Sequence, residues 1–265
     1  MQLNHTCILK YMYINCHSNF SLKRGTLSVK KLVQLAAEKG ITQLALTDVN
    51  NTSAGFDFLK ACKNQKIQGV VGIEFRDDDG QLLYVGLPKN QDGFQELSNL
   101  LTKKLKDKVD LPKTPPKLNK AFFVIPMSHN LDPSKLAPNH YVGITHYWAK
   151  HNFLHPVWKT PQKLVAFHPV FFARNKAHYE LHQVLRAIDQ NELLSKLKPT
   201  DIEPHHHSFC SPDELKKLFG DRDFLLHNAT WLLDQCSSNY YPEEVKNKSS
   251  YKSTKSKDVA LLKHS

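Results

Sequence analysis

The sequence lacks a long hydrophobic run and has few cysteines. No apolar stretch approaches the roughly 20 residues that span a bilayer, and residues 1–10 lack the basic head and apolar stretch of a signal peptide. We therefore expect a cytoplasmic protein without a membrane partner. The five cysteines are odd in number and show no Cys-x-x-Cys spacing, which argues against a disulfide framework or a zinc knuckle. We expect reduced, mostly buried thiols at Cys7, Cys16, Cys62, Cys210 and Cys236.

Several common catalytic motifs are also absent. The sequence contains no Gly-rich phosphate loop, no nucleophile elbow and no Rossmann fingerprint. His178 and His182 are spaced as a helical pair that could bind a metal with His168, but no Glu stands beside His178 as the zinc-protease motif requires. We expect this pair to be surface histidines. The run 205–207 is expected to be a solvent-exposed stretch of a polar loop.

The composition is that of a globular protein with a basic excess. Of the residues, 40% are hydrophobic and 23% are charged, and 36 Lys and Arg against 25 Asp and Glu give a net charge of +11. Part of the excess lies in 240–265, where lysines stand among Ser and Thr, as in a basic tail. The excess fits proximity to nucleic acid or an acidic partner, and it also fits a plain solvated surface.

Two successive strand-helix-strand units predict an α/β fold. The first helix begins after Ser28 as its N-cap and ends at Gly40, which can take positive φ. The second helix covers 53–64, with an apolar face of Phe56, Leu59 and Cys62. The strands of these units are expected over 6–15, 41–47 and 67–75.

The remainder of the chain continues the alternation. Asp77-Asp78-Asp79-Gly80 predicts a hairpin turn, and the three prolines of 110–118 predict a loop. Further strands are expected over 81–87, 121–127, 141–145 and 163–167. Further helices are expected over 90–108, 133–136, 147–153, 177–191 and 224–236. Another helix is expected to begin after Ser211, which is its N-cap. From Ser237 onward we expect a linker or disorder.

Polar residues follow three of the predicted strands. His17, Asp48 and Glu74 each end an apolar run, and parallel strands place such ends on one edge of a sheet. They are suitable ligands for Zn²⁺ or Mn²⁺, and three ligands leave a position for a water nucleophile. The alternative is structural: His17 hydrogen-bonds a loop, Asp48 caps the helix near Ser53, and Glu74 pairs with a surface Lys.

These motifs resemble the PHP (polymerase and histidinol phosphatase) domain at the N-terminus of bacterial DNA polymerase III alpha subunits. The similarity extends over about 11–262. It lies in Asn15-Cys16-His17-Ser18-Asn19-Phe20-Ser21, Leu44-Ala45-Leu46-Thr47-Asp48 and Gly72-Ile73-Glu74, in the Gly-Phe-x-x-Leu helix within 84–101, and in the closing helices of 182–188 and 209–236.

The resemblance implies an α/β fold, a distorted seven-stranded β/α barrel with C-terminal helices. It implies a PHP domain over 1–238 and a basic linker over 239–265, the start of a segment that leads to a polymerase body absent from this chain. Active members of the family hydrolyse phosphate esters with up to three metal ions, in some cases as 3′-5′ exonucleases.

The sequence departs from the family pattern at most ligand positions. The family's histidine or acidic ligands are replaced by Asn15, Arg24, Val49, Pro169 and Phe171. Val, Pro and Phe side chains cannot donate to a metal. Arg24 brings a fixed positive charge to a place meant for cations.

We therefore expect a non-catalytic PHP module, with no metal cofactor, that contacts the polymerase body, DNA and other replication subunits in a full-length protein. Replicative and error-prone roles both remain open. The alternative is a residual phosphoesterase that uses Zn²⁺ or Mn²⁺ on His17, Asp48 and Glu74, with His129 or His168 as substitute ligands. A third possibility is direct binding of DNA by the basic surface.

Overall fold

Strands make up the centre of the molecule. The computed structural model describes residues 11–128, 131–237, 256, 259 and 260. Its strands are β1 (Met12–Cys16), β2 (Gln43–Leu46), β3 (Gln68–Val71), β4 (Ile73–Arg76), β5 (Leu82–Pro88), β6 (Ala121–Pro126), β7 (His140–Ile144) and β8 (Leu164–Ala166).

Helices alternate with these strands. The α-helices are α1 (Val29–Glu38), α2 (Gly55–Asn64), α3 (Gln91–Leu105), α4 (His146–His151), α5 (Lys176–Gln190), α6 (Pro212–Phe219) and α7 (Phe224–Asp234). Short 3-10 helices are η1 (Pro133–Lys135), η2 (Pro156–Lys159), η3 (Pro161–Lys163), η4 (Leu194–Lys196) and η5 (Gly220–Arg222). No helix among the described residues has both the length and the apolar character that crossing a membrane requires.

The first two strand-helix-strand units form as the sequence predicts. Strands β1, β2 and β3 pair in parallel in that order. The Ser28 side chain accepts a hydrogen bond from the Lys31 amide at the start of α1, and Gly40 has φ +73° just beyond its end. The apolar face expected on α2 is wrong in one position. Phe56 is 61% exposed, and Phe58 is buried instead.

The second sheet is mixed, with the order β4-β5-β6-β7-β8. The predicted hairpin turn at Asp77–Gly80 is confirmed, since it joins β4 to β5 as an antiparallel pair. Strand β5 also pairs antiparallel with β6, whereas β6, β7 and β8 run parallel. The prediction of an α/β protein is therefore confirmed at the level of a mixed α/β fold.

The two sheets meet at two edges. Strands β3 and β4 are consecutive in the chain and separated only by Gly72, where a Cβ would lie 2.4 Å from the Gly86 carbonyl oxygen. Single bridges join Val49 to Glu74 and Cys16 to Val170. The structure thus assigns eight strands to two sheets within the described residues, and the seven-stranded barrel remains a prediction.

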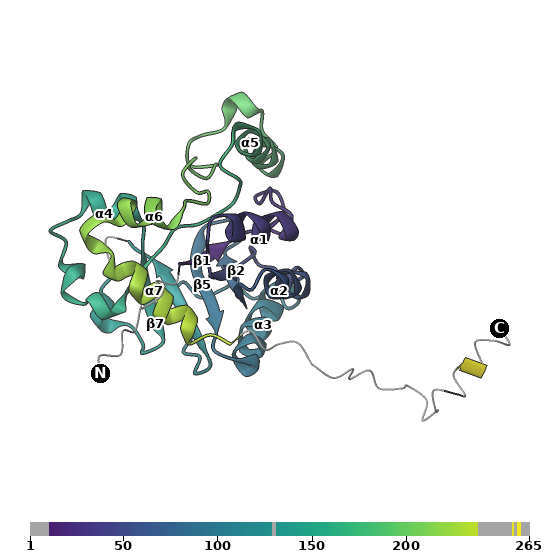
Figure 1. The fold of residues 1–265 in the computed structure, drawn as a ribbon, viewed down its shortest axis with the longest axis horizontal. Helices are drawn as coiled ribbons and strands as arrows, with labels where there is room; N and C mark the ends of the chain where they lie inside the picture. Colours follow the sequence, from purple (N-terminus) through teal and green to yellow (C-terminus); the bar gives the residue numbers. More distant parts are fainter. Residues whose placement is uncertain (1–10, 129–130, 238–255, 257–258, 261–265) are drawn as a thin grey trace, which may run out of the picture.

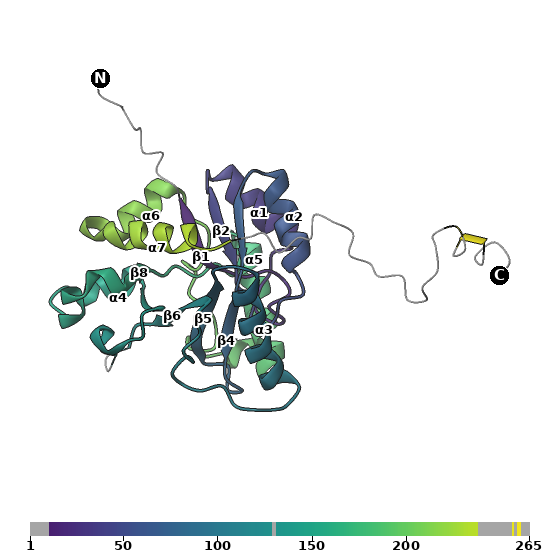
Figure 2. The same cartoon turned by 90° about the horizontal axis from the view of Figure 1, so that it is seen from below.

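Helices cover both sides of the strands. In Figures 1 and 2, α1, α2 and α3 lie on one side and α4, α6 and α7 on the other. Figure 1 shows α5 apart from both groups. Helix α2 packs on β3, α3 on β5, and α7 on β1 and β8. The predicted Ser211 cap is a full capping box with Glu214. Cys16, Cys62, Cys210 and Cys236 are free and buried, as predicted.

Some sequence predictions concern residues outside the described part of the chain. They are the first five residues of the strand expected over 6–15, the thiol of Cys7, the substitute ligand His129, and all of the linker 239–265 except 256, 259 and 260.

The loop that follows β1 depends on a close backbone approach at Gly25. A Cβ at this position would lie 1.9 Å from the Ser18 carbonyl oxygen. We expect Gly25→Ala to lower the free energy of unfolding by at least about 2 kcal/mol, because the backbone of this loop must move. Gly55→Ala is the control, since its Cβ would meet only the Val71 side chain at 3.2 Å. Urea denaturation measures both, and equal stabilities would contradict the prediction.

Candidate functional site at the carboxyl ends of the strands

Two of the three predicted site residues meet. His17 follows β1 and Glu74 lies in β4, and His17 Nε2 is 3.0 Å from Glu74 Oε2. Asn15 donates from Nδ2 to the same oxygen at 2.8 Å. The His17 and Glu74 side chains are both fully buried. The two sheets therefore bring the first and third motifs together where they adjoin at Gly72, between β3 and β4.

Asp48 does not join this pair through its carboxylate. Its Oδ1 accepts from the Ser18 amide and the Ser21 hydroxyl, each at 2.7 Å. Its Oδ2 accepts from the Ser18 hydroxyl at 2.7 Å. The structural alternative, in which Asp48 caps the helix near Ser53, is wrong, because α2 has no side-chain cap. Asp48 instead fixes the loop after β1.

Glu74 pairs with a buried arginine, not with a surface lysine as the structural alternative proposed. Arg76 Nε lies 2.5 Å from Glu74 Oε1, and its Nη2 lies 3.3 Å from Glu203 Oε1. Arg76 Nη1 donates to the Gly80 carbonyl oxygen at 2.9 Å. One guanidinium thus links β4, the hairpin turn and the 199–208 segment.

A second arginine completes this network. Arg24 Nη1 lies 3.4 Å from the same Glu203 oxygen. His182 accepts from the Glu203 amide at 3.0 Å through Nε2, and its Nδ1 donates to the Arg24 carbonyl oxygen at 2.7 Å. The prediction that His178 and His182 are both surface histidines is therefore wrong for His182, which is fully buried.

These side chains line a cavity of about 420 Å³. Its walls include Arg24, Glu74, Arg76, Pro169, Phe171, Arg186, Glu203 and His207. The cavity is the polar mouth of the strand assembly, at the edge that the sequence predicted for a site.

The charges in the mouth compensate one another. Burial alone would raise the pKa of Glu74, but Arg76 and His17 outweigh burial and hold that pKa well below its usual range. Burial likewise opposes ionisation of Glu203, yet the hydrogen bond from His207 and the charge of Arg76 lower its pKa to about 2. Burial and the neighbouring Arg76 lower the pKa of Arg24 to about 10.

The three apolar substitutions lie close to the same mouth. The Phe171 ring stacks on His17 with 3.8 Å between centroids and 5° between planes. Pro169 lines the cavity beside it. Val49 forms the bridge to Glu74, and its amide donates to the Ser21 hydroxyl at 3.0 Å.

A metal cluster does not fit the side chains of the mouth as they lie. Among the described residues, no three His, Cys, Asp or Glu side chains form a group that could hold a metal ion. Of the predicted remnant ligands, Asp48 is bound by serines, and Glu74 is bound by Arg76, Asn15 and His17. A guanidinium therefore supplies the positive charge beside Glu74.

Sequence reasoning missed Arg76, Glu203 and His207. Arg76 was detectable, because it lies two residues after Glu74 in a strand and so faces the same side. Glu203 and His207 lie more than a hundred residues away from Glu74, and no local pattern connects them to the strand ends. The prediction that 205–207 is exposed holds for His205 and His206 but is wrong for His207, which is half-buried beside Glu203.

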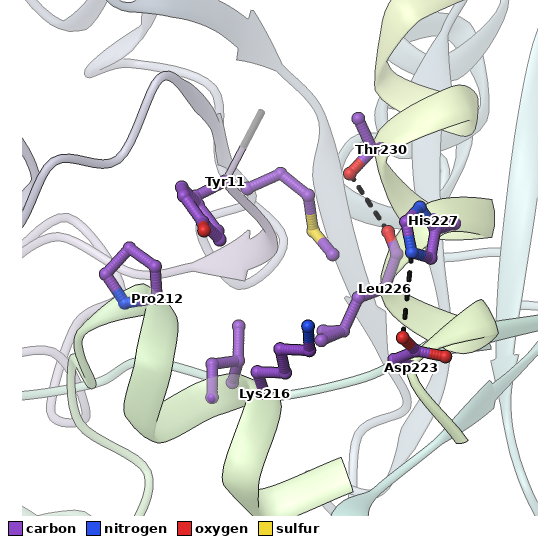
Figure 3. A pocket seen from close by; sticks show the side chains of 9 residues that line it. Tyr11, Pro212, Lys216, Asp223, Leu226, His227 and Thr230 are labelled. Carbon is purple, nitrogen blue, oxygen red and sulfur yellow. Dashed lines mark hydrogen bonds and ion pairs between the residues drawn. The ribbon is translucent and has the colours of Figure 1, made fainter. Parts of the chain in front are cut away.

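A second hollow lies at the other end of β1. It measures about 40 Å³ and is lined by β1, α6 and α7 (Figure 3). His227 and Asp223 approach to 3.9 Å at its edge. This volume is too small for a substrate, so the mouth remains the candidate site.

Part of the chain matches a recognised family of domains. Residues 14–132 match the family model described as the PHP domain. The resemblance predicted from the strand-end motifs is thus confirmed over this range.

The similar proteins include DNA polymerase III alpha subunits and an error-prone DNA polymerase. The chain is 39% identical over 66 residues to the DNA polymerase III subunit alpha of Chlamydia muridarum. The aligned segment is 25% of this chain and 5% of that protein. It is 33% identical over 93 residues to the error-prone DNA polymerase of Pseudomonas aeruginosa, covering 35% and 9%. It is 33% identical over 94 residues to the DNA polymerase III subunit alpha of Bacillus subtilis, covering 34% and 8%. The matched segment therefore spans less than a tenth of each of these relatives.

Solved structures give a weaker likeness. A structure described as that of a putative metal-dependent phosphoesterase from Bifidobacterium adolescentis aligns with a TM-score of 0.28 and 20% identity over 38% of this chain and 36% of that chain.

The buried ion pair of Glu74 and Arg76 can be tested by a double-mutant cycle. We expect Glu74→Gln and Arg76→Met each to lower the free energy of unfolding by about 3–5 kcal/mol, because each leaves the partner charge buried. The double variant should lose less than the sum, with a coupling of about 1–3 kcal/mol.

The exposed pair Lys176 and Glu180, whose nitrogen and oxygen are 3.6 Å apart, is the control for this cycle. Its coupling should stay below about 1 kcal/mol. Urea denaturation measures all variants. Additive losses at Glu74 and Arg76 would show that the two charges do not stabilise each other.

Glu203 should make the protein sensitive to acid. The pKa of Glu203 is about 2 in the folded state, whereas the pKa of a Glu in an unfolded chain is about 4.3. Ionised Glu203 therefore stabilises the fold fully above the unfolded pKa, and this contribution is lost as the pH falls toward 2. We expect Glu203→Gln to unfold more easily at neutral pH and to lose less stability on acidification. Urea denaturation at stepped pH tests this, and identical pH slopes for both proteins would refute it.

Proposed function

We propose that this chain is a non-catalytic PHP module related to the N-terminal domain of DNA polymerase III alpha subunits. In this role it acts as a cytoplasmic scaffold that contacts a polymerase body, DNA and other replication subunits. The observation that carries the proposal is the Arg76 guanidinium, bound at 2.5 Å to the Glu74 carboxylate in the mouth. The similarity to polymerase subunits supports the biological setting.

The chemistry of the mouth favours a scaffold over a phosphoesterase. A metal-dependent hydrolase needs an ion with an open coordination position, where a bound water becomes a nucleophile. A guanidinium carries charge but has no such position, and its high pKa prevents it from acting as a base. Pro169 and Phe171 line the mouth, and their side chains have no atom that could coordinate a metal ion.

The same network has a structural role that fits a scaffold. Arg76 and Arg24 both bind Glu203, so the loop after β1, the β4–β5 hairpin and the 199–208 segment meet at one carboxylate. Breaking a buried ion pair by removing one partner costs several kcal/mol. The mouth thus stabilises the relative positions of segments that a metal cluster would otherwise hold.

The proposal includes the finer architecture. We infer a distorted seven-stranded barrel in which β3 and β4 count as one strand bent at Gly72. The bridges from Val49 to Glu74 and from Cys16 to Val170 support closure of such a ring. The domain division at 238, with a basic linker over 239–265, is part of the same proposal.

An activity assay tests the scaffold role. The protein is stripped of metal, reloaded with Mn²⁺ or Zn²⁺, and incubated with p-nitrophenyl phosphate and with a 3′-tailed oligonucleotide. We expect no hydrolysis above that of Glu74→Ala, because no open metal position is available at this carboxylate.

Glu180→Ala is the matched control, since it removes an exposed carboxylate on α5. Hydrolysis that survives in Glu180→Ala and disappears in Glu74→Ala would overturn the scaffold role. It would establish the alternative, a residual metal-dependent phosphoesterase or exonuclease.

A further inference from the structure

A strip of exposed aromatic and basic side chains runs along α4 and the turn that follows it. Tyr147, Lys150 and His151 are spaced i, i+3 and i+4, so they share one face of α4. The ring centroids of Tyr147 and His151 lie 4.2 Å apart. Phe153 follows directly and is 64% exposed, and Tyr147 is 62% exposed. These four residues, together with Lys159 at the end of η2, form what we call the α4 surface.

The segment that carries this surface is basic and has no acidic residue. Over 133–179 the chain has six Lys and Arg and no Asp or Glu. Lys150 and Lys159 are both exposed, and neither forms an ion pair with a carboxylate of the described residues. Their positive charges are therefore available to an anionic partner.

Hydrogen bonds hold the turn between α4 and η2 in place. Asn152 Nδ2 donates to the Trp148 carbonyl oxygen at 3.0 Å, and Trp158 Nε1 donates to the Asn152 carbonyl oxygen at 2.8 Å. Arg222 Nη2 donates to the Phe153 carbonyl oxygen at 3.2 Å. The Arg222 guanidinium also lies 3.6 Å from the centre of the Trp158 ring. The backbone of the turn is thus fixed while the Phe153 ring stays exposed, so a partner that stacks on this ring loses less free energy to ordering the protein.

We propose that the α4 surface binds single-stranded DNA. Bases stack on the rings of Tyr147 and Phe153, and phosphates lie against Lys150 and Lys159. Exposed aromatic rings beside basic side chains are the combination that binds unpaired bases and their backbone without sequence preference. A duplex keeps its base faces inside its own stack, so it can be attracted by the two lysines but cannot use the two rings.

This inference rests on the part of the proposed function in which the chain contacts DNA, and it names the surface and the form of DNA. The α4 surface is separate from the mouth, because none of its five residues lines the cavity at Glu74. Hydrolysis at Glu74 would overturn the scaffold role and leave DNA binding at α4 unaffected. A failure of binding at α4 would leave the outcome of the hydrolysis assay unchanged, so the two failures are distinguishable.

Fluorescence anisotropy of a labelled oligothymidylate of about 16 nucleotides, titrated with the full chain at low salt, tests the proposal. We expect Tyr147→Ala and Phe153→Ala each to weaken binding at least about fivefold, and Tyr147→Phe to retain it because the ring remains. Lys150→Ala should weaken binding and make the slope of log affinity against log salt concentration shallower by about 0.7. Binding of a duplex of the same length should not change in Tyr147→Ala. Circular dichroism checks that each variant is folded.

Phe56→Ala and Lys60→Ala are the matched controls. Phe56 is 61% exposed, Lys60 is exposed one turn later on the same helix, and α2 lies on the other side of the strands from α4 (Figures 1 and 2). We expect both variants to bind the oligonucleotide as the unmodified protein does. Equal losses in the α2 and α4 variants would mean attraction by the overall positive charge and would overturn the proposal. Absence of binding at low salt, or a loss in Lys150→Ala with none in Tyr147→Ala and Phe153→Ala, would overturn it as well.

Discussion

The buried carboxylate of Glu74 is the constraint on which the mouth depends. An isolated ionised carboxylate in a protein interior costs many kcal/mol, so it must be paired or neutralised. Here Arg76, Asn15 and His17 supply the pairing. Because Arg76 also binds Glu203, neutralising one carboxylate brings a distant segment of the chain onto the strand ends.

An arginine and a metal ion both meet this constraint, but with different consequences. A divalent cation can be removed, and it leaves coordination positions to which a substrate binds. A guanidinium is attached to its strand and presents a fixed set of donors. Those donors are used here on Glu74, Gly80 and Glu203, so Arg76 stabilises the mouth and leaves little for chemistry.

The sequence predicted what local patterns decide. The cap at Ser28, the turn residue Gly40 and the Asp77–Gly80 hairpin are each determined by a few neighbouring residues, and all were correct. The meeting of His17 and Glu74 followed from the rule for strand ends.

What local patterns do not decide was missed or mistaken. The partner of Asp48 depends on how the loop after β1 folds back, because the Ser18 amide and the serine hydroxyls compete with any helix start. Glu203 reaches the mouth only through the tertiary path of the segment after α5. The spacing of apolar residues and the composition of the sequence predict neither the partners of Asp48 nor the position of Glu203.

Glu203 joins the two arginines of the mouth to His207. It accepts from Arg24 and Arg76 through Oε1, and its Oε2 accepts from His207 Nδ1. Burial opposes the ionised form of this carboxyl group, but only the ionised form neutralises both guanidiniums. The hydrogen bond from His207 and the charge of Arg76 therefore keep Glu203 ionised, and the ionised carboxylate holds the loop after β1, the β4–β5 hairpin and the 199–208 segment together.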